Sequence, residues 1–275
     1  MINYIFDQCK QSKVYSAVTI LFIVLSGWWV SMYLRGLTEG LENDVFTVVY
    51  CVLALLGSSA GFVYAQKWGG LSSVLGRSIS FFTLGLFAQF IGQVLYNYYI
   101  YVLGIEVPYP SIGDISFFAS VVFYILGIIS LAKVSGAKFS YQSMSGKFLA
   151  FVVPAVMLVL SYVIFLKGYQ PDWSNLTVVF LDFGFPIGQA VYVSIALFTL
   201  LVSQSKLGGV MRRPILFIIF ALILQYLADF SFSYQVAHET WYVGGINDYL
   251  FAAAYFLMAT SLFFVGSSFN KIKDS

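Results

Sequence analysis

Eight apolar stretches run through this sequence, and each is long enough to cross a lipid bilayer as a helix. A hydrocarbon core of about 30 Å takes roughly 20 apolar residues at helical rise. The stretches are Val14–Leu34, Val45–Ala65, Ser78–Leu103, Ile115–Val134, Phe148–Leu166, Thr177–Val202, Pro214–Val236 and Asp248–Val265. Of the 275 residues, 60% are apolar and 9% are charged, and the mean hydropathy is +0.87. Because this composition does not suit a water-soluble domain, the sequence predicts an all-α integral membrane protein with eight transmembrane helices, a single domain over residues 1–275.

The basic residues divide unequally between the two sides of the predicted bundle. Of the fourteen lysines and arginines, only Arg35 and Lys167 fall on one side. The opposite side receives Lys10, Lys13, Lys67, Arg77, Lys133, Lys138, Lys147, Lys206, Arg212, Arg213, Lys271 and Lys273. Acidic residues gather on the poorer side, at Glu39, Glu42, Asp44, Glu106, Asp114, Asp172, Glu239 and Asp248. The positive-inside rule therefore predicts a multi-pass protein of the cell membrane with both termini in the cytoplasm.

The two halves of the chain share a pattern of residues. A shift of 136 places Arg77, Phe81, Gln89, Gln93 and Tyr98 on Arg213, Phe217, Gln225, Asp229 and Tyr234. A shift of 134 places Asp114 on Asp248, and the offset changes only in loops. Because each unit has an even number of spans, both copies enter the membrane in the same direction. The sequence predicts a tandem parallel 4+4 repeat, with copies at about 13–135 and about 147–268.

Two carboxylates and four glutamines lie inside the predicted spans. Ionisable groups in a span cost a few kcal/mol and normally face the bundle interior. At about 1.5 Å per residue, Asp182 and Asp229 each lie roughly 8–10 Å below the outer boundary, in one layer. The spacing of Asp182, Pro186 and Gln189 places all three on one helical face. We expect an interior polar layer that consists of Gln89, Gln93, Asp182, Gln189, Gln225 and Asp229.

Each of these polar groups has a structural and a functional interpretation. The glutamines can hold helices together by hydrogen bonds worth around 1 kcal/mol or less each. The aspartates cost more free energy to place inside a span, so they are candidates for binding a ligand or carrying a proton. Gly184 and Gly188, beside Pro186, let another helix or a ligand approach closely.

The predicted fourth and eighth helices begin with residues that can cap them. Pro110 leads into the fourth helix, where Ser111 or Asp114 can bond the exposed backbone donors, and Asn247 and Asp248 do the same for the last helix. A contact with a ligand is the alternative role for these residues.

Several classes of function are excluded by what the sequence lacks. No lysine lies within a span, so a retinal Schiff base is excluded, and no nucleophile motif, P-loop or paired catalytic acid is present. The single histidine, His238, cannot supply bis-histidine haem ligation, and no cluster of cysteine and histidine indicates zinc. Basic residues are scattered over five segments, which argues against a nucleic-acid partner. We expect no cofactor and no metal, and the sequence favours a protein that is not an enzyme.

Three short motifs carry a resemblance to a known group of proteins. They are Tyr109-Pro110-Ser111-Ile112-Gly113-Asp114, then Phe185-Pro186-Ile187-Gly188-Gln189, and Asp248 at the start of the last span. The chain resembles the multi-helix sensory input regions that precede GGDEF diguanylate cyclase or histidine kinase modules in bacteria, with Gln189 in place of their aspartate. The resemblance implies a sensory role. We expect no output module, since only six residues follow Phe269.

These observations favour a stand-alone membrane sensor or ligand-binding module. It would take an apolar or amphipathic small molecule from the external side and pass a helix shift to a cytoplasmic protein partner. A proton-coupled transporter, in which Asp182 and Asp229 exchange protons as substrate binds, is the second hypothesis. A structural subunit of a larger membrane complex is the third.

Overall fold

A computed structural model describes residues 12–135, 144–163, 167, 171, 173–203 and 212–273. Over these residues the chain forms eight α-helices and no strand. The helices are α2 (Lys13–Leu34), α3 (Leu41–Lys67), α4 (Val74–Asn97), α5 (Ile112–Val134), α6 (Met144–Ser161), α7 (Leu176–Ser203), α8 (Arg212–Ala237) and α9 (Ile246–Lys273). A short 3-10 turn, Gly70–Ser72, precedes α4, and a π-helical turn, Tyr98–Val102, extends it.

Seven of these helices are long and apolar enough to cross a membrane, which confirms the predicted all-α, membrane-embedded character. The remaining helix, α6, contains a shorter apolar segment, Phe151–Leu160. Its predicted span continues to Leu166, and residues 164–166 lie outside the described part of the chain. Large apolar side chains point outward from the bundle, for example Ile23 of α2, which is 63% exposed, and Phe151 of α6, which is 75% exposed. Such surfaces suit contact with lipid.

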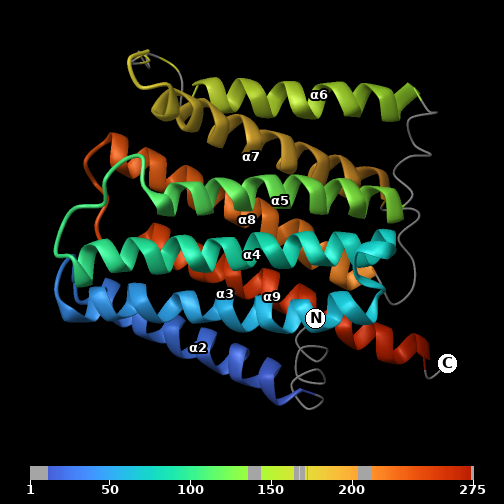
Figure 1. Ribbon diagram of the computed structural model, residues 1–275, viewed down its shortest axis with the longest axis horizontal. Helices are drawn as coiled ribbons and strands as arrows, with labels where there is room; N and C mark the ends of the chain where they lie inside the picture. The colour runs from blue at the N-terminus through green and yellow to red at the C-terminus, as the bar shows by residue number, and fades with distance from the viewer. Residues whose placement is uncertain are drawn as a thin grey trace.

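Successive helices run in alternating directions, so all their connections fall at two ends of the bundle (Figure 1). One end, on the left in Figure 1, carries Glu39, Glu42, Asp44, Glu106, Glu239 and Asp248, and we call it the acidic end. The other, the basic end, carries the starts of α2, α4 and α8 and the end of α3, with Lys13, Lys67, Arg77 and Arg212. Lys10, Lys138, Asp172 and Lys206, which also entered the topology prediction, lie outside the described residues.

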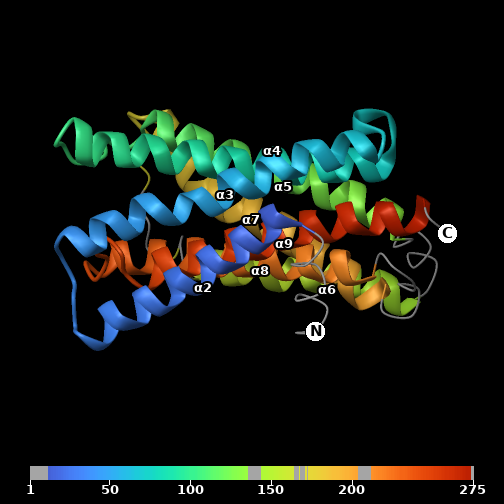
Figure 2. The ribbon, with the colours of Figure 1, turned by 90° about the horizontal axis from the view of Figure 1, so that it is seen from below.

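Six helices close into a ring in the order α3, α4, α5, α7, α8, α9, in which each contacts the next and α9 returns to α3. Helix α2 packs outside this ring against α3 and α9, and Figure 2 shows it running alongside them. Helix α6 packs on α7, at the opposite edge of the bundle from α2 (Figure 1). The ring therefore encloses the core, and the first helix of each predicted copy is peripheral.

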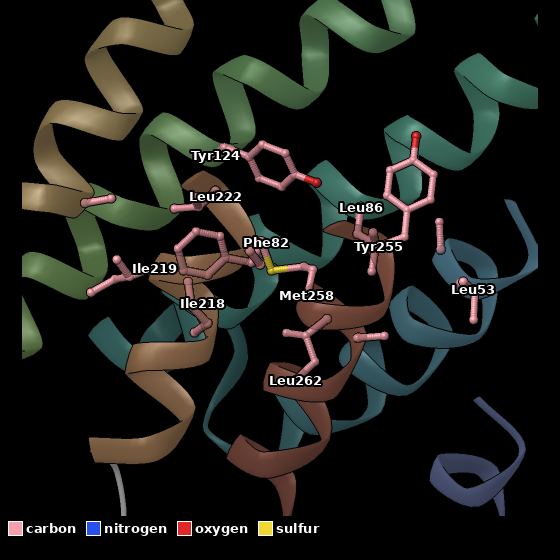
Figure 3. Close-up of a cluster of buried hydrophobic side chains, with 14 of the residues drawn as sticks. Leu53, Phe82, Leu86, Tyr124, Ile218, Ile219, Leu222, Tyr255, Met258 and Leu262 are labelled. Atoms are coloured by element: carbon pink, nitrogen blue, oxygen red, sulfur yellow. The ribbon is translucent and has the colours of Figure 1, made fainter. Parts of the chain in front are cut away.

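The core of the ring is mainly apolar. Figure 3 shows Phe82 and Leu86 of α4, Leu222 of α8, and Met258 and Leu262 of α9 packed together. Each of these side chains is at most 2% exposed. Lipid tails are as apolar as these residues, so burial alone does not hold transmembrane helices together, and close packing has to supply the attraction.

Small residues allow this close packing. A Cβ atom added at Gly57 of α3 would lie 2.5 Å from the Cβ of Ala259 and 3.0 Å from its Cα, so α3 and α9 meet almost backbone to backbone. Gly85 and Gly92 of α4 accept the rings of Tyr124 and Phe117 of α5 in the same way, at 2.4 and 2.6 Å.

We predict that Gly57→Ala lowers the thermal stability of the protein in detergent or nanodiscs. The added methyl meets backbone atoms that cannot move aside alone, and overpacking of this kind costs about 1–3 kcal/mol. Gly27→Ala is the matched control, since Gly27 is exposed in α2 and has nothing within 4 Å of the added Cβ. Its helix propensity improves, so its melting temperature should stay the same or rise. Equal melting temperatures for the two variants would contradict the prediction.

Candidate functional site

The start of α5 is closed by the predicted capping residues. The Ser111 hydroxyl oxygen accepts a hydrogen bond from the Asp114 N–H at 3.2 Å. In return, the Asp114 carboxylate accepts from the Ser111 N–H and hydroxyl, both at 2.7 Å. The Tyr96 hydroxyl also donates to this carboxylate. The capping role is therefore confirmed, and Pro110 lies in the loop directly before this capping box.

Asp248 closes the start of α9 in a related way. Its carboxylate accepts from the Gly244 N–H at 2.7 Å and from the hydroxyl of Tyr50 in α3 at 3.1 Å. The loop before α9 is also held by α2, because the Trp29 indole N–H lies 3.2 Å from the Gly244 carbonyl oxygen. The side-chain oxygen of Asn247 makes no hydrogen bond within the described residues, so Asp248 has the capping role predicted for the pair.

All four predicted interior glutamines are buried. Their exposed fractions are 3% for Gln89, 8% for Gln93, 5% for Gln189 and 3% for Gln225. Gln89 of α4 joins three helices, since its amide donates to the Ser120 hydroxyl of α5 at 2.7 Å and its carbonyl accepts from the Tyr255 hydroxyl of α9 at 3.0 Å. This arrangement matches the structural interpretation of Gln89.

The two aspartates of the predicted layer lie in different surroundings. Asp182 of α7 is partly buried and accepts a hydrogen bond from the Tyr109 hydroxyl, in the loop before α5, at 2.5 Å. Asp229 of α8 is also partly buried and accepts from the Gln225 amide, one turn earlier in its own helix, at 3.2 Å. Their carboxylates thus have separate partners.

The glycines beside Pro186 admit a neighbouring helix. Pro186 is buried inside α7. A Cβ at Gly184 would lie 2.8 Å from the Phe118 ring, and one at Gly188 would lie 2.6 Å from a methyl group of Val121. Both neighbours belong to α5, so of the two predicted possibilities, a helix or a ligand, a helix occupies this surface.

Sequence reasoning missed a group of buried tyrosines around Asp229. Tyr124 of α5, Tyr192 of α7 and Tyr255 of α9 are each at most 1% exposed. The rings of Tyr124 and Tyr192 meet edge to face at 5.9 Å. The Asp229 carboxylate interacts electrostatically with all three hydroxyl groups. The Tyr192 hydroxyl has no hydrogen-bond partner among the residues that the structure describes.

The sequence contained a signal for this group. Tyrosine is usually placed at the membrane interfaces, where its hydroxyl meets water. Each of these three tyrosines, however, lies well inside an apolar helix, where a hydroxyl needs a partner in the protein. A phenol in the middle of a span therefore indicates the bundle interior.

On the inner face of α8, Asp229 is the first side chain that is partly exposed. Ile218, Leu222, Gln225, Asp229 and Ser233 follow one another on one face at helical spacing. The first three are buried, with exposed fractions of 1%, 0% and 3%, whereas Asp229 is partly exposed and Ser233 is exposed. The side chains on this face are therefore buried up to Gln225 and partly or fully exposed beyond it, toward the acidic end. We call Tyr124, Tyr192, Gln225, Asp229 and Tyr255 the Asp229 site.

Among the described residues, no three histidine, cysteine, aspartate or glutamate side chains lie together in a way that could hold a metal ion. No model of a known protein family matches this chain, and no characterised protein or solved structure is significantly similar to it.

We predict that Gln89→Leu destabilises the bundle by about 1 kcal/mol, because it removes the link between α4, α5 and α9 and leaves the Tyr255 hydroxyl without its acceptor. Gln93→Leu is the control, since Gln93 lies one turn further along α4, is also buried, and has no hydrogen bond in the described structure. Thermal unfolding followed by circular dichroism compares the two. A loss of stability as large for Gln93→Leu would show that removing any buried amide is enough.

Proposed function

We propose that this chain is a membrane sensor or ligand-binding module that takes an apolar or amphipathic small molecule from the acidic end. The observation that carries the proposal is the position of Asp229, at the point where the buried inner face of α8 becomes accessible. A carboxylate in a span is costly and normally has a role. The hydroxyl groups of three buried tyrosines from three other helices interact electrostatically with it, so a molecule bound there would lie next to α5, α7, α8 and α9.

A molecule at this site would also provide a means of signalling. Because α7 and α8 are connected at the basic end, and α9 ends there, a shift of these helices at the acidic end would be passed to the basic end. In our proposal the acidic end is external, α6 is the eighth span, and both termini are cytoplasmic, as the distribution of lysine and arginine indicates. A cytoplasmic protein partner would read the shift at the basic end.

We also propose that the bundle arose as a tandem parallel 4+4 repeat. Most helix contacts support it, because exchanging the two halves maps the pairs α2–α3, α3–α4, α4–α5 and α3–α9 onto α6–α7, α7–α8, α8–α9 and α7–α5, all of which are present. The contacts of α9 with α2 and α4 have no such counterpart of comparable extent. The capping carboxylates Asp114 and Asp248 are equivalent under this exchange and have equivalent roles.

The resemblance to sensory input regions is compatible with this scheme. The aspartate of the Tyr-Pro-Ser motif, Asp114, and the proline of the second motif, Pro186, both have structural roles in this bundle. Such motifs would define the scaffold, and the ligand would be chosen by residues that differ between the copies, such as Gln93 and Asp229.

We predict that the purified protein carries a bound small molecule that native mass spectrometry detects, and that Asp229→Asn loses it. Asp182→Asn is the matched control, because it removes a partly buried carboxylate from a neighbouring helix and should retain the molecule. A wild-type protein without any bound molecule would argue against the proposed function. A molecule retained equally by both variants would place its site away from Asp229.

Proton-coupled transport is the second candidate, and the unpartnered hydroxyl of Tyr192 near Asp229 favours it, since a proton carrier needs a polar group behind it. In liposomes with an imposed pH gradient, the transporter hypothesis predicts gradient-driven substrate flux through the wild-type protein and none through the double variant Asp182→Asn, Asp229→Asn. Full gradient-driven flux through the double variant would exclude a proton-carrying role for both carboxylates.

A further inference from the structure

The charge on Asp229 has no basic partner in the part of the chain that the structure describes. The salt bridge found there, Arg35 with Glu42 at 2.5 Å, lies at the acidic end between α2 and α3. The carboxylate of Asp229 accepts a hydrogen bond from the neutral Gln225 amide. A single neutral donor compensates little of the cost of a carboxylate in a span. A positive charge brought by a ligand would compensate it directly.

The other walls of the site are suited to a cation rather than to a second neutral polar group. Aromatic rings attract cations through the negative charge on their faces. Tyr124, Tyr192 and Tyr255, whose hydroxyl groups interact electrostatically with Asp229, would supply such rings. The attraction strengthens where water is excluded, and all three rings are buried. The free Tyr192 hydroxyl can accept a hydrogen bond from an ammonium group.

The floor of the site is apolar. Below Gln225, the inner face of α8 continues with Leu222, which is fully buried. Figure 3 shows Leu222, Leu86 and Met258 close to Tyr124 and Tyr255. These apolar side chains offer no oxygen ligands to a metal ion, which binds through oxygen, nitrogen or sulfur atoms. They do match the hydrocarbon part of an organic molecule.

We propose that the Asp229 site binds an organic cation, an amine or quaternary ammonium compound with an apolar substituent, whose charge pairs with Asp229 between the tyrosine rings. The proposal rests on the ligand-binding function above and specifies its ligand class. The cation reaches Asp229 from the acidic end, where the inner face of α8 is exposed. Its apolar substituent contacts the buried aromatic and aliphatic side chains beside it.

The test uses two probes of the same shape, benzyltrimethylammonium and its uncharged carbon analogue neopentylbenzene. The full chain is placed in nanodiscs of zwitterionic lipid, so that anionic lipid does not bind the cation. Binding is measured by calorimetry and by the shift in melting temperature. Benzyltrimethylammonium should bind the wild-type protein and raise its melting temperature, and neopentylbenzene should do neither at the same concentration.

Variants locate the interaction. Asp229→Asn should weaken benzyltrimethylammonium binding by at least about thirtyfold, since breaking a desolvated charge pair costs about 2 kcal/mol or more. Asp229→Glu, which keeps the charge, should retain most of the affinity, and Asp182→Asn should leave it unchanged within about twofold. Tyr192→Phe, which keeps the ring, should bind more tightly than Tyr192→Leu, which removes it. Because the probe pair compares charge on the unaltered protein, the test does not depend on a variant that folds.

The outcomes separate this proposal from the one it rests on. Equal binding of the two probes, or binding that Asp229→Asn does not change, would overturn the cation proposal and leave a ligand-binding function standing. Binding of neither probe, with an Asp229-dependent molecule still seen by native mass spectrometry, would do the same. Binding of neither probe by a protein that carries no molecule would overturn both.

Discussion

Every backbone N–H and C=O in the hydrocarbon region has to be paired within the chain, because no water is available there and each unpaired group costs several kcal/mol. This constraint makes the spans helical and leaves only side chains to hold them together. The bundle uses two devices for that purpose. Glycines such as Gly57 bring helix backbones together, and single polar bridges such as Gln89 join three helices at once. The same constraint applies to the ends of helices, where Asp114 and Asp248 pair backbone donors that the helix itself leaves open.

The parts of this fold that could be predicted follow from that constraint. The spans and their alternating directions follow from apolar length, and the cap at Asp114 follows from a local spacing of residues. The ring order was not predictable in this way, because several neighbours, such as α5 and α7, are decided by side-chain fit between distant segments. The directions of the side chains in the expected polar layer were not predictable for a related reason. Depth along a helix places Asp182 and Asp229 at one level, but it does not give the direction of each side chain, and Asp182 accepts from Tyr109 instead.

The buried tyrosines show why composition misleads in a membrane protein. Tyrosine makes up 20 of the 275 residues, and most tyrosines in such proteins belong to the interfaces. Tyr124, Tyr192 and Tyr255 are different because their hydroxyl groups lie at depths where no water meets them. Tyr255 meets this requirement through Gln89, whereas the described structure offers no partner to Tyr192. Other buried polar atoms of the described structure also lack a partner, so what distinguishes Tyr192 is the electrostatic interaction of its hydroxyl with the Asp229 carboxylate.

The two proposed copies differ at the position of Asp229, and this difference explains why a binding site would lie there. Gln93 and Asp229 occupy equivalent positions, but Gln93 is buried to 8% exposure and neutral, whereas Asp229 is charged when deprotonated and partly exposed. A neutral amide can be enclosed at little cost, so the first copy can close around it. A carboxylate is costly to enclose unless several donors compensate it, as they do at the buried Asp114 and Asp248. Asp229 has one neutral donor, and the bundle leaves it partly exposed at the boundary between the buried and exposed parts of the α8 inner face. A cation at Asp229 would remove that cost and permit α8 to close against its neighbours, which links occupancy of the site to the position of a helix.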